Sequence, residues 1–158
     1  MKVRNCMTTP VFTVHPMDSL RHAARLMWDR DCGALPVADG GLVVGMITDR
    51  DICMAALIQQ APLGEIFVVS AMSRTVHVCT DDDTVEAAEE IMRRNQVRRL
   101  PVQDGARKLV GILSLNDLAR RSQSFWNRTA SKALRHGALA RTLAAVSERR
   151  DASVRQGA

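Results

Sequence analysis

The hydrophobic pattern of this chain occurs twice along its length. In residues 7–54 and again in residues 72–120, an extended apolar segment precedes a helical apolar stripe and two short apolar runs. The stripes have the spacing of one face of an α-helix and consist of Leu20, Ala23, Ala24 and Met27, and of Val85, Ala88 and Met92. Two copies of one pattern predict two similar units related by a pseudo-twofold axis.

Each copy predicts the element order β-α-β-β-α. Ser19 and Thr84 are the expected N-caps of the first helices. The next strands contain Ala-Leu-Pro-Val and Arg-Leu-Pro-Val, and proline restricts such a strand to an edge or an end of its sheet. An Asp-Gly pair, at 39–40 and 104–105, then predicts a hairpin turn before a returning strand. The expected fold class is therefore α/β in the broad sense (α+β), with two β-α-β-β-α units and a C-terminal helical tail.

Two strand-to-helix turns carry the candidate chemistry. The returning strands end in Gly-Met-Ile-Thr-Asp-Arg-Asp (45–51) and Gly-Ile-Leu-Ser-Leu-Asn-Asp (111–117), where second helices are expected to begin. A helix start favours anions through its free N–H groups and its dipole. An ionised aspartate only accepts hydrogen bonds, so Asp51 and Asp117 suit the vicinal hydroxyls of a ribose. Plain capping by Thr48 and Ser114 is the alternative, and the recurrence of the turn in register weakens it.

Composition limits the classes of protein and of site. Only 3% of the 158 residues are aromatic, so the core must be aliphatic and rich in methionine. No apolar run approaches the roughly 20 residues of a membrane span, and residues 1–6 lack the apolar stretch of a signal peptide, which predicts a cytoplasmic protein. No metal site is expected, because no metal-binding spacing joins the four cysteines, which are expected to be buried reduced thiols: Cys6, Cys32, Cys53 and Cys79.

The positive charge is concentrated in the C-terminal tail. The chain has a formal net charge of +5, whereas residues 120–158 hold nine Lys or Arg and two acidic residues. The repeated body is therefore slightly acidic, and the tail supplies an alternative function, docking on nucleic acid or on an acidic protein partner. Its apolar members predict a helix that packs on the body or on a second subunit: Trp126, Ala130, Ala133, Leu134, Leu143 and Val146.

Over about residues 3–121 the chain resembles a tandem pair of CBS domains, named from cystathionine beta-synthase. The resemblance rests on the repeat, on the proline-containing strand and on the turn Gly-h-h-[Thr/Ser]-x-x-Asp, where h is apolar. The chain is also similar to stand-alone bacterial CBS-pair proteins of the hypoxic-response type. The resemblance implies a Bateman module, with CBS unit 1 in 1–58, a linker in 59–70, CBS unit 2 in 71–122 and the basic tail in 123–158.

In similar modules, two clefts between the units bind adenosine compounds such as AMP, ADP, ATP or S-adenosylmethionine. Carried over residue by residue, one cleft would place the ribose at Thr48 and Asp51, opposite Val76, His77, Val97, Arg98 and Arg99. The other would use Ser114 and Asp117, opposite Pro10, Phe12, Cys32, Gly33 and Ala34. The resemblance thus implies an adenosine effector and no obligatory cofactor.

The two implied clefts differ in charge. Arg98 and Arg99 offer guanidinium groups that match phosphate oxygens, whereas the equivalent Gly33 and Ala34 offer none. We therefore predict a phosphorylated ligand in the first cleft, and a second cleft that is empty, weak or suited to an uncharged adenosine. The alternative for the two arginines is a solvated surface pair, and strand alternation would direct only one of them into the cleft.

The expected function is regulatory binding without catalysis. The sequence holds no phosphate-binding glycine motif and no nucleophile that can be placed beside a base, so we predict no enzyme. We expect a module that senses adenine nucleotides and passes the signal to an unidentified downstream protein or to its own assembly state. Exposed apolar helix faces in such a module predict a homodimer, with no membrane partner.

Overall fold

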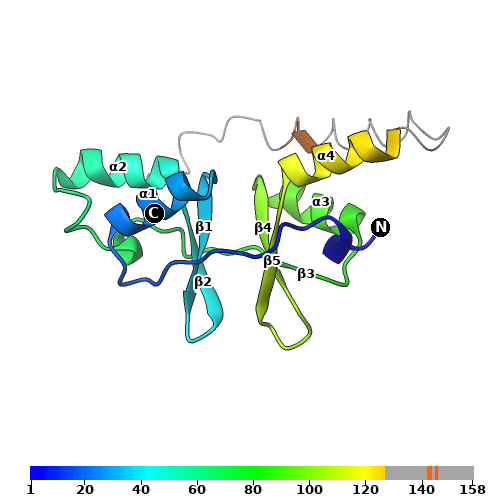
Figure 1. Ribbon diagram of the computed structural model, residues 1–158, viewed down its shortest axis with the longest axis horizontal. Helices are drawn as coiled ribbons and strands as arrows, with labels where there is room; N and C mark the ends of the chain where they lie inside the picture. Colours follow the sequence, from blue (N-terminus) through cyan, green and yellow to red (C-terminus); the bar gives the residue numbers. More distant parts are fainter. Residues whose placement is uncertain (127–141, 144, 146–158) are drawn as a thin grey trace. The chain divides into compact units, whose positions relative to one another are not determined.

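The computed structural model describes residues 1–126, 142, 143 and 145 of the chain. It forms two compact units, and Figure 1 shows their helices and strands. The first-repeat unit comprises Pro10–Val78 with Gln103–Val110, and the second-repeat unit comprises Met1–Thr9, Cys79–Val102 and the chain from Gly111 on. The predictions for a helix and a docking function in the basic tail fall almost entirely outside the described residues.

The segment that precedes each repeat belongs to the unit of the other repeat, whereas the boundaries predicted from the sequence follow the repeats. The 3₁₀-helix η1 (Val3–Asn5) belongs to the second-repeat unit, where Val85 N donates to Met1 O at 2.8 Å. The equivalent η2 (Val68–Ser70) belongs to the first-repeat unit, where Val68 N donates to Asp18 O at 2.8 Å. Ile66 and Val68 are buried in the core of the first-repeat unit, so the segment predicted to be a linker forms part of that core.

The first-repeat unit is a β-hairpin covered by two helices. Its main elements are α1 (Leu20–Asp29), β1 (Ala34–Asp39), β2 (Leu42–Thr48) and α2 (Asp49–Gln59). β1 and β2 are antiparallel, so Ala34 lies opposite Thr48 at the end of the hairpin where α2 begins. Gly40 and Gly41 form the turn at the other end with φ of +55° and +83°, which confirms the predicted Asp-Gly hairpin.

The second-repeat unit holds most of a three-stranded sheet in the order β3-β4-β5, whose hairpin end (Gln103–Val110) is assigned to the other unit. Its elements are β3 (Cys79–Thr80), α3 (Val85–Asn95), β4 (Arg99–Gln103), β5 (Leu109–Ser114) and α4 (Leu115–Trp126). Pro101 lies in the middle strand β4, so the predicted edge position is wrong for this proline. A middle position is tolerable because β3 is only two residues long and proline keeps its carbonyl acceptor. The turn also differs, since Arg107 and not Gly105 takes positive φ, at +63°.

The sequence predicted the helix caps and the core stripes correctly. The Ser19 and Thr84 side chains accept hydrogen bonds from His22 N and Ala87 N, both at 3.2 Å. The predicted stripes of α1 and α3 are buried apart from Ala24, which is half-buried: Leu20, Ala23, Met27, Val85, Ala88 and Met92. Together with the buried faces of the strands, these stripes confirm an aliphatic, methionine-containing core.

The cysteines differ in burial more than the sequence suggested. Cys6 and Cys79 are buried and Cys32 is half-buried, but Cys53 is exposed on α2, so its predicted burial is wrong. Burial, the charge of Asp83 and the neighbouring Cys6 thiol raise the pKa of Cys79 to about 12. Within the described residues, no group of three or more His, Cys, Asp or Glu is arranged to hold a metal ion. In the same part of the chain, no helix has the length and apolar character needed to cross a bilayer.

Candidate functional site

Asp51 is fixed at the start of α2 by a two-way cap with Thr48, the residue that ends β2. The Thr48 backbone N–H and hydroxyl donate to Asp51 Oδ2 at 2.8 and 2.7 Å. In return, Asp51 N donates to the Thr48 hydroxyl at 3.2 Å. The threonine hydroxyl therefore donates to the carboxylate and accepts from the backbone N–H of the same residue, Asp51. These two bonds hold the carboxylate in one orientation.

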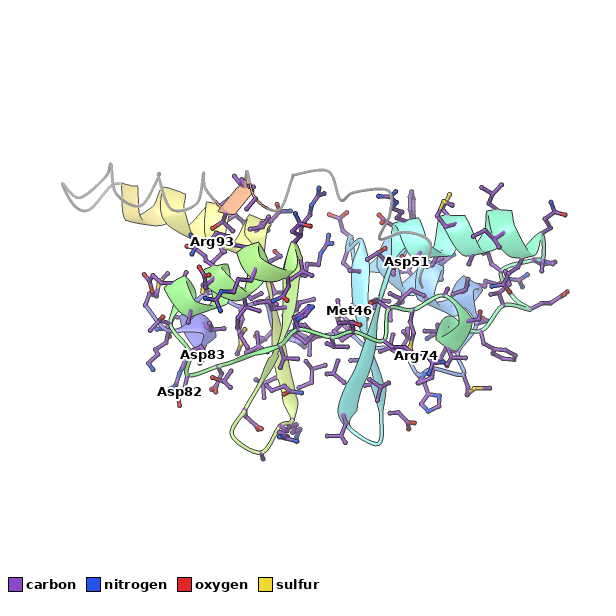
Figure 2. All side chains as sticks on the ribbon, turned by 180° about the vertical axis from the view of Figure 1, so that it is seen from behind. Met46, Asp51, Arg74, Asp82, Asp83 and Arg93 are labelled. Atoms are coloured by element: carbon purple, nitrogen blue, oxygen red, sulfur yellow. The ribbon has the colours of Figure 1, made fainter. Side chains whose placement is uncertain are left out.

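The other carboxylate oxygen of Asp51, Oδ1, is not used by the cap. Within the described residues, Oδ1 accepts no hydrogen bond, and the side chain is half-buried. Figure 2 shows Asp51 at the first turn of α2, beyond Met46 on β2. The cap and the predicted ligand role are therefore compatible, because capping uses only one of the two oxygens.

The start of α2 is not an open anion site, contrary to our expectation from the sequence. The first N–H of the helix, that of Asp49, donates to Gly33 O at 3.3 Å. Arg50 N donates to the Asp49 carboxylate at 2.7 Å, and Asp51 N is used by Thr48. The free donors on which the expectation relied are thus occupied, and the remaining chemistry of this turn is that of a hydrogen-bond acceptor.

Asp117 in the second-repeat unit has the same cap but no free oxygen. Oδ2 accepts from Ser114 N at 2.8 Å and from the Ser114 hydroxyl at 2.5 Å. Oδ1 accepts from the Thr8 hydroxyl at 2.9 Å and from the Arg120 guanidinium. The residue is only 5% exposed. Burial by itself raises the pKa of Asp117, but hydrogen bonds from Ser114, Thr8 and Arg120 outweigh it and lower the pKa below its ordinary value.

A glycine at the same place in each motif allows a methionine from a distant segment of the chain to approach. At Gly111 a Cβ would lie 2.5 Å from Met7 Sδ, and at Gly45 it would lie 2.7 Å from Met72 Sδ. These close approaches let residue 8 pair with residue 112, and residue 73 with residue 46. The two hydroxyls then differ, because Thr8 donates to Asp117 whereas Ser73 donates to Thr75 O at 3.3 Å.

Several predicted ligand residues of the first-repeat unit lie beside its own turn. Gly33 O accepts from Asp49 N, and Ala34 pairs with Thr48 across the hairpin. Cys32 N donates to Met27 O at 3.0 Å, and the Arg30 guanidinium lies 4.1 Å from the centre of the Phe12 ring. The others are Pro10, which is exposed, and Val76 and His77, which are half-buried in a segment without regular structure.

The predicted phosphate ligands belong to the second-repeat unit. Arg99 opens β4, Arg98 and Val97 precede it, and Arg98 O accepts from Leu115 N at 3.1 Å beside the Ser114–Asp117 turn. Arg98 is exposed and Arg99 is half-buried. The assignment of these residues to a ligand at Asp51, and of the five residues from Pro10 to Ala34 to a ligand at Asp117, stays a prediction.

Sequence reasoning missed two residues that define the second turn. Arg120 lies three residues after Asp117, a helical spacing that places a cation beside the carboxylate and could have been recognised. Thr8 is distant in sequence, and only the small residue at Gly111 hinted that another segment approaches there. Both residues donate to the carboxylate of Asp117, which the repeat alone predicts to be equivalent to that of Asp51.

A family model for the CBS domain matches residues 3–58 and 63–124 of this chain. The chain belongs to the CBS domain family. Its two matched ranges confirm the CBS pair inferred from the repeated turns. The CBS domain-containing protein YhcV of Bacillus subtilis (strain 168) is 38% identical over 136 residues, which cover 84% of this chain and 91% of YhcV.

Solved structures of CBS pairs have the same fold. The CBS domain pair of protein MJ0100, in complex with 5'-methylthioadenosine and S-adenosyl-L-methionine, matches with a TM-score of 0.70 at 28% identity and covers 78% of this chain and 97% of its own. CBSX2 in complex with AMP gives 0.67 at 27% identity, covering 79% and 98%. Hypoxic Response Protein I with two coordinated zinc ions gives 0.66 at 30% identity, covering 77% and 98%, which confirms the likeness to the hypoxic-response type.

Proposed function

We propose that this CBS pair is a regulatory module that binds an adenosine-containing ligand, with the ribose hydroxyls donating to Asp51. The observation that carries the proposal is Oδ1 of Asp51, which accepts no hydrogen bond from any described residue and belongs to a carboxylate whose other oxygen is held by Thr48. A carboxylate accepts from both hydroxyls of a vicinal diol, and its fixed orientation lowers the entropy lost on binding.

The family supports the ligand class. The solved CBS pairs most relevant here hold S-adenosyl-L-methionine, 5'-methylthioadenosine or AMP, which share an adenosine. The ligand of this chain is therefore proposed to be AMP, ADP, ATP or an S-adenosylmethionine-type compound. The protein acts without catalysis, as an effector-binding protein that signals to a downstream partner through the packing of its units.

Calorimetric titration of the whole chain with AMP, ADP, ATP and S-adenosylmethionine tests the proposal. At least one ligand should bind, and Asp51→Ala should lower its affinity at least about tenfold, because a charge-assisted hydrogen bond is worth about 1.5–3 kcal/mol. The 2'-deoxy form of the same ligand should show a comparable loss on the wild type and little further loss on Asp51→Ala.

Asp49→Ala is the matched control for the aspartate. Asp49 lies in the same first turn of α2 and is exposed, and among the described residues its carboxylate accepts only from the adjacent Arg50 N. Its substitution should leave the affinity within about twofold of wild type. No binding of any of the four ligands, or equal losses for Asp49→Ala and Asp51→Ala, would contradict the proposal.

A further inference from the structure

A cavity of about 450 Å³ lies between α1 and α2 of the first-repeat unit, the two helices that cover its hairpin (Figure 1). Sites for small molecules measure about 300–1,000 Å³, so the cavity is large enough for one. All of its described lining lies within residues 24–53, so one unit forms it alone. Cys32 and Gly33, which the resemblance places opposite Asp117, also line it, but Asp51 is not among its described lining residues. The cavity is therefore separate from the proposed ribose acceptor.

Much of the cavity lining is apolar, and one of its side chains is aromatic. Met27 of α1 and Ile52 of α2 contribute buried side chains, and Ala24 of α1 adds a small, half-buried one. Trp28 also lines the cavity, although the residue is 83% exposed. A ligand with an apolar body would therefore cover part of an indole ring that otherwise lies in water.

The charged groups of the lining are acidic. Asp31 and Asp49 are exposed, and neither carboxylate forms an ion pair with a described residue. No Lys, Arg or His occurs among the described residues that line the cavity. The sequence neighbours Arg30 and Arg50 are not among them, and the Arg30 guanidinium lies over the Phe12 ring. Because α1 ends and α2 begins beside the cavity, their dipoles oppose each other, and the two carboxylates set its charge.

The fold of the repeat does not require this lining. In the repeat alignment, Trp28, Asp31 and Asp49 have these counterparts in the second repeat: Arg93, Gln96 and Leu115. The second repeat thus forms the same two helices with neither carboxylate and with a cation in place of the indole. The backbone is common to both repeats, since Asp31 has a φ of +48° and Gln96 one of +50°. The acidic and aromatic character of the cavity is therefore specific to the first repeat.

We infer that this cavity binds a small organic cation with an apolar body, of the alkylammonium or arylalkylammonium class. The carboxylates of Asp31 and Asp49 attract the positive group, and the Trp28 ring adds a cation–π contact. The hydrocarbon part of the ligand covers Met27 and Ile52. An anion of the same shape meets two like charges instead. The site goes beyond the proposed adenosine function and does not depend on it.

Calorimetric titration of the full chain with phenethylammonium tests the charge preference. This cation should bind at millimolar concentration or below, and its affinity should fall as salt is added. Phenethyl alcohol has nearly the same shape without the charge, and it should bind at least about threefold more weakly. Phenylacetate, an anion, should bind more weakly still. A cation that does not bind, or an alcohol that binds equally well, would overturn the inference.

Neutral variants of the two carboxylates test their role. Asp31→Asn/Asp49→Asn should lower the affinity for phenethylammonium at least about fivefold and leave that for phenethyl alcohol unchanged. Asparagine tolerates the positive φ at position 31, and at position 49 its amide oxygen can still accept from Arg50 N, so the fold should be kept. Asp39→Asn is the matched control, because Asp39 is exposed at the other end of the hairpin, and its affinity should stay within about twofold of wild type. Equal losses in the double variant and the control would overturn the inference.

Trp28 and Cys53 test the place of binding. Trp28→Leu should lower the affinity for phenethylammonium at least about threefold, and Trp28→Phe, which keeps an aromatic face, should lower it less. Cys53 is exposed and lines the cavity, so saturating phenethylammonium should slow its alkylation by iodoacetamide, measured by mass spectrometry. An unchanged affinity of Trp28→Leu, or unchanged alkylation of Cys53, would place the cation elsewhere and overturn the inference. Titration of Asp31→Asn/Asp49→Asn with the four adenosine ligands separates this result from adenosine binding, which should persist.

Discussion

The turn at Asp51 and the turn at Asp117 have the same motif and the same cap, but among the described residues only Asp51 keeps one carboxylate oxygen without a donor. In each turn, one carboxylate oxygen accepts hydrogen bonds from the hydroxyl and from the backbone N–H of the Thr or Ser three residues earlier. The second oxygen of Asp51 accepts no hydrogen bond from the part of the chain that the structure describes, whereas that of Asp117 accepts from Thr8 and Arg120. The comparison teaches that a repeated motif fixes where a carboxylate lies, while residues outside the motif decide whether both of its oxygens are satisfied within the protein.

Two substitutions between the repeats account for the difference. Thr8 is replaced by Ser73, whose hydroxyl donates to Thr75 O, and Arg120 is replaced by Met54, which has no donor. From the sequence, we expected a ligand to prefer the first turn because of the charge of Arg98 and Arg99. The two substitutions supply a different cause for the same preference. Asp117 is a buried, internally satisfied group of the kind that stabilises a fold.

The largest effect should come from replacing Asp117 by asparagine, with the same replacement at Asp51 as its comparison. At Asp117 the new amide NH₂ would face donors on whichever side it lies, so Asp117→Asn should lower the free energy of unfolding by about 2–3 kcal/mol. At Asp51 the NH₂ can lie at the free position, and the loss should stay below about 1 kcal/mol. Urea unfolding of both variants measures the difference, and equal losses would show that the two turns are not distinct in stability.

The sequence predicted the elements of this fold because their signals are local. Caps at Ser19 and Thr84, the stripe of α1 and the Asp-Gly turn at residues 39–40 each depend on neighbours within a few positions. The strand position of Pro101 was wrong because a two-residue strand leaves almost no periodicity to recognise. The role of the 59–70 segment also escaped prediction, since it depends on which unit buries Ile66 and Val68.

The candidate site was predictable in part for the same reason. The Thr48–Asp51 and Ser114–Asp117 pairs follow from a spacing of three residues at a helix start. The closure of Asp117 does not, because Thr8 reaches it from more than a hundred positions away. Local patterns therefore located both carboxylates and could not distinguish their states.

Acid should weaken the second turn in a recognisable way. The folded-state pKa of Asp117 lies below its ordinary value of 3.8, so its stabilisation is fully present above that pH and is lost as the pH falls through the lower folded-state value. Wild type should lose more stability than Asp117→Asn between about pH 5 and about pH 2.5. Urea unfolding at both pH values measures this, and parallel losses in the two proteins would assign the acid sensitivity to other groups.

Removing the Thr8 hydroxyl should have a smaller effect than changing the aspartate. Thr8→Val keeps the shape of the side chain and leaves Arg120 as the partner of Oδ1, so the free energy of unfolding should fall by about 1 kcal/mol. Ser73→Ala is the equivalent change in the first turn and should have less effect, because the Ser73 hydroxyl is exposed and water can donate to Thr75 O in its place. A double-mutant cycle of Thr8→Val with Asp117→Asn should show coupling between the two residues.

The smallest effect on stability should come from Arg120→Met, which gives the second turn the residue of the first. The Arg120 side chain is 71% exposed, so its ion pair with Asp117 should contribute no more than about 0.5–1 kcal/mol, and this contribution should shrink as salt is added. The combined variant Thr8→Val/Arg120→Met leaves Oδ1 of Asp117 without either donor, as Oδ1 of Asp51 is. If donors alone distinguish the turns, calorimetry should show a second equivalent of adenosine ligand bound by this variant, and an unchanged stoichiometry would show that burial closes the second turn as well.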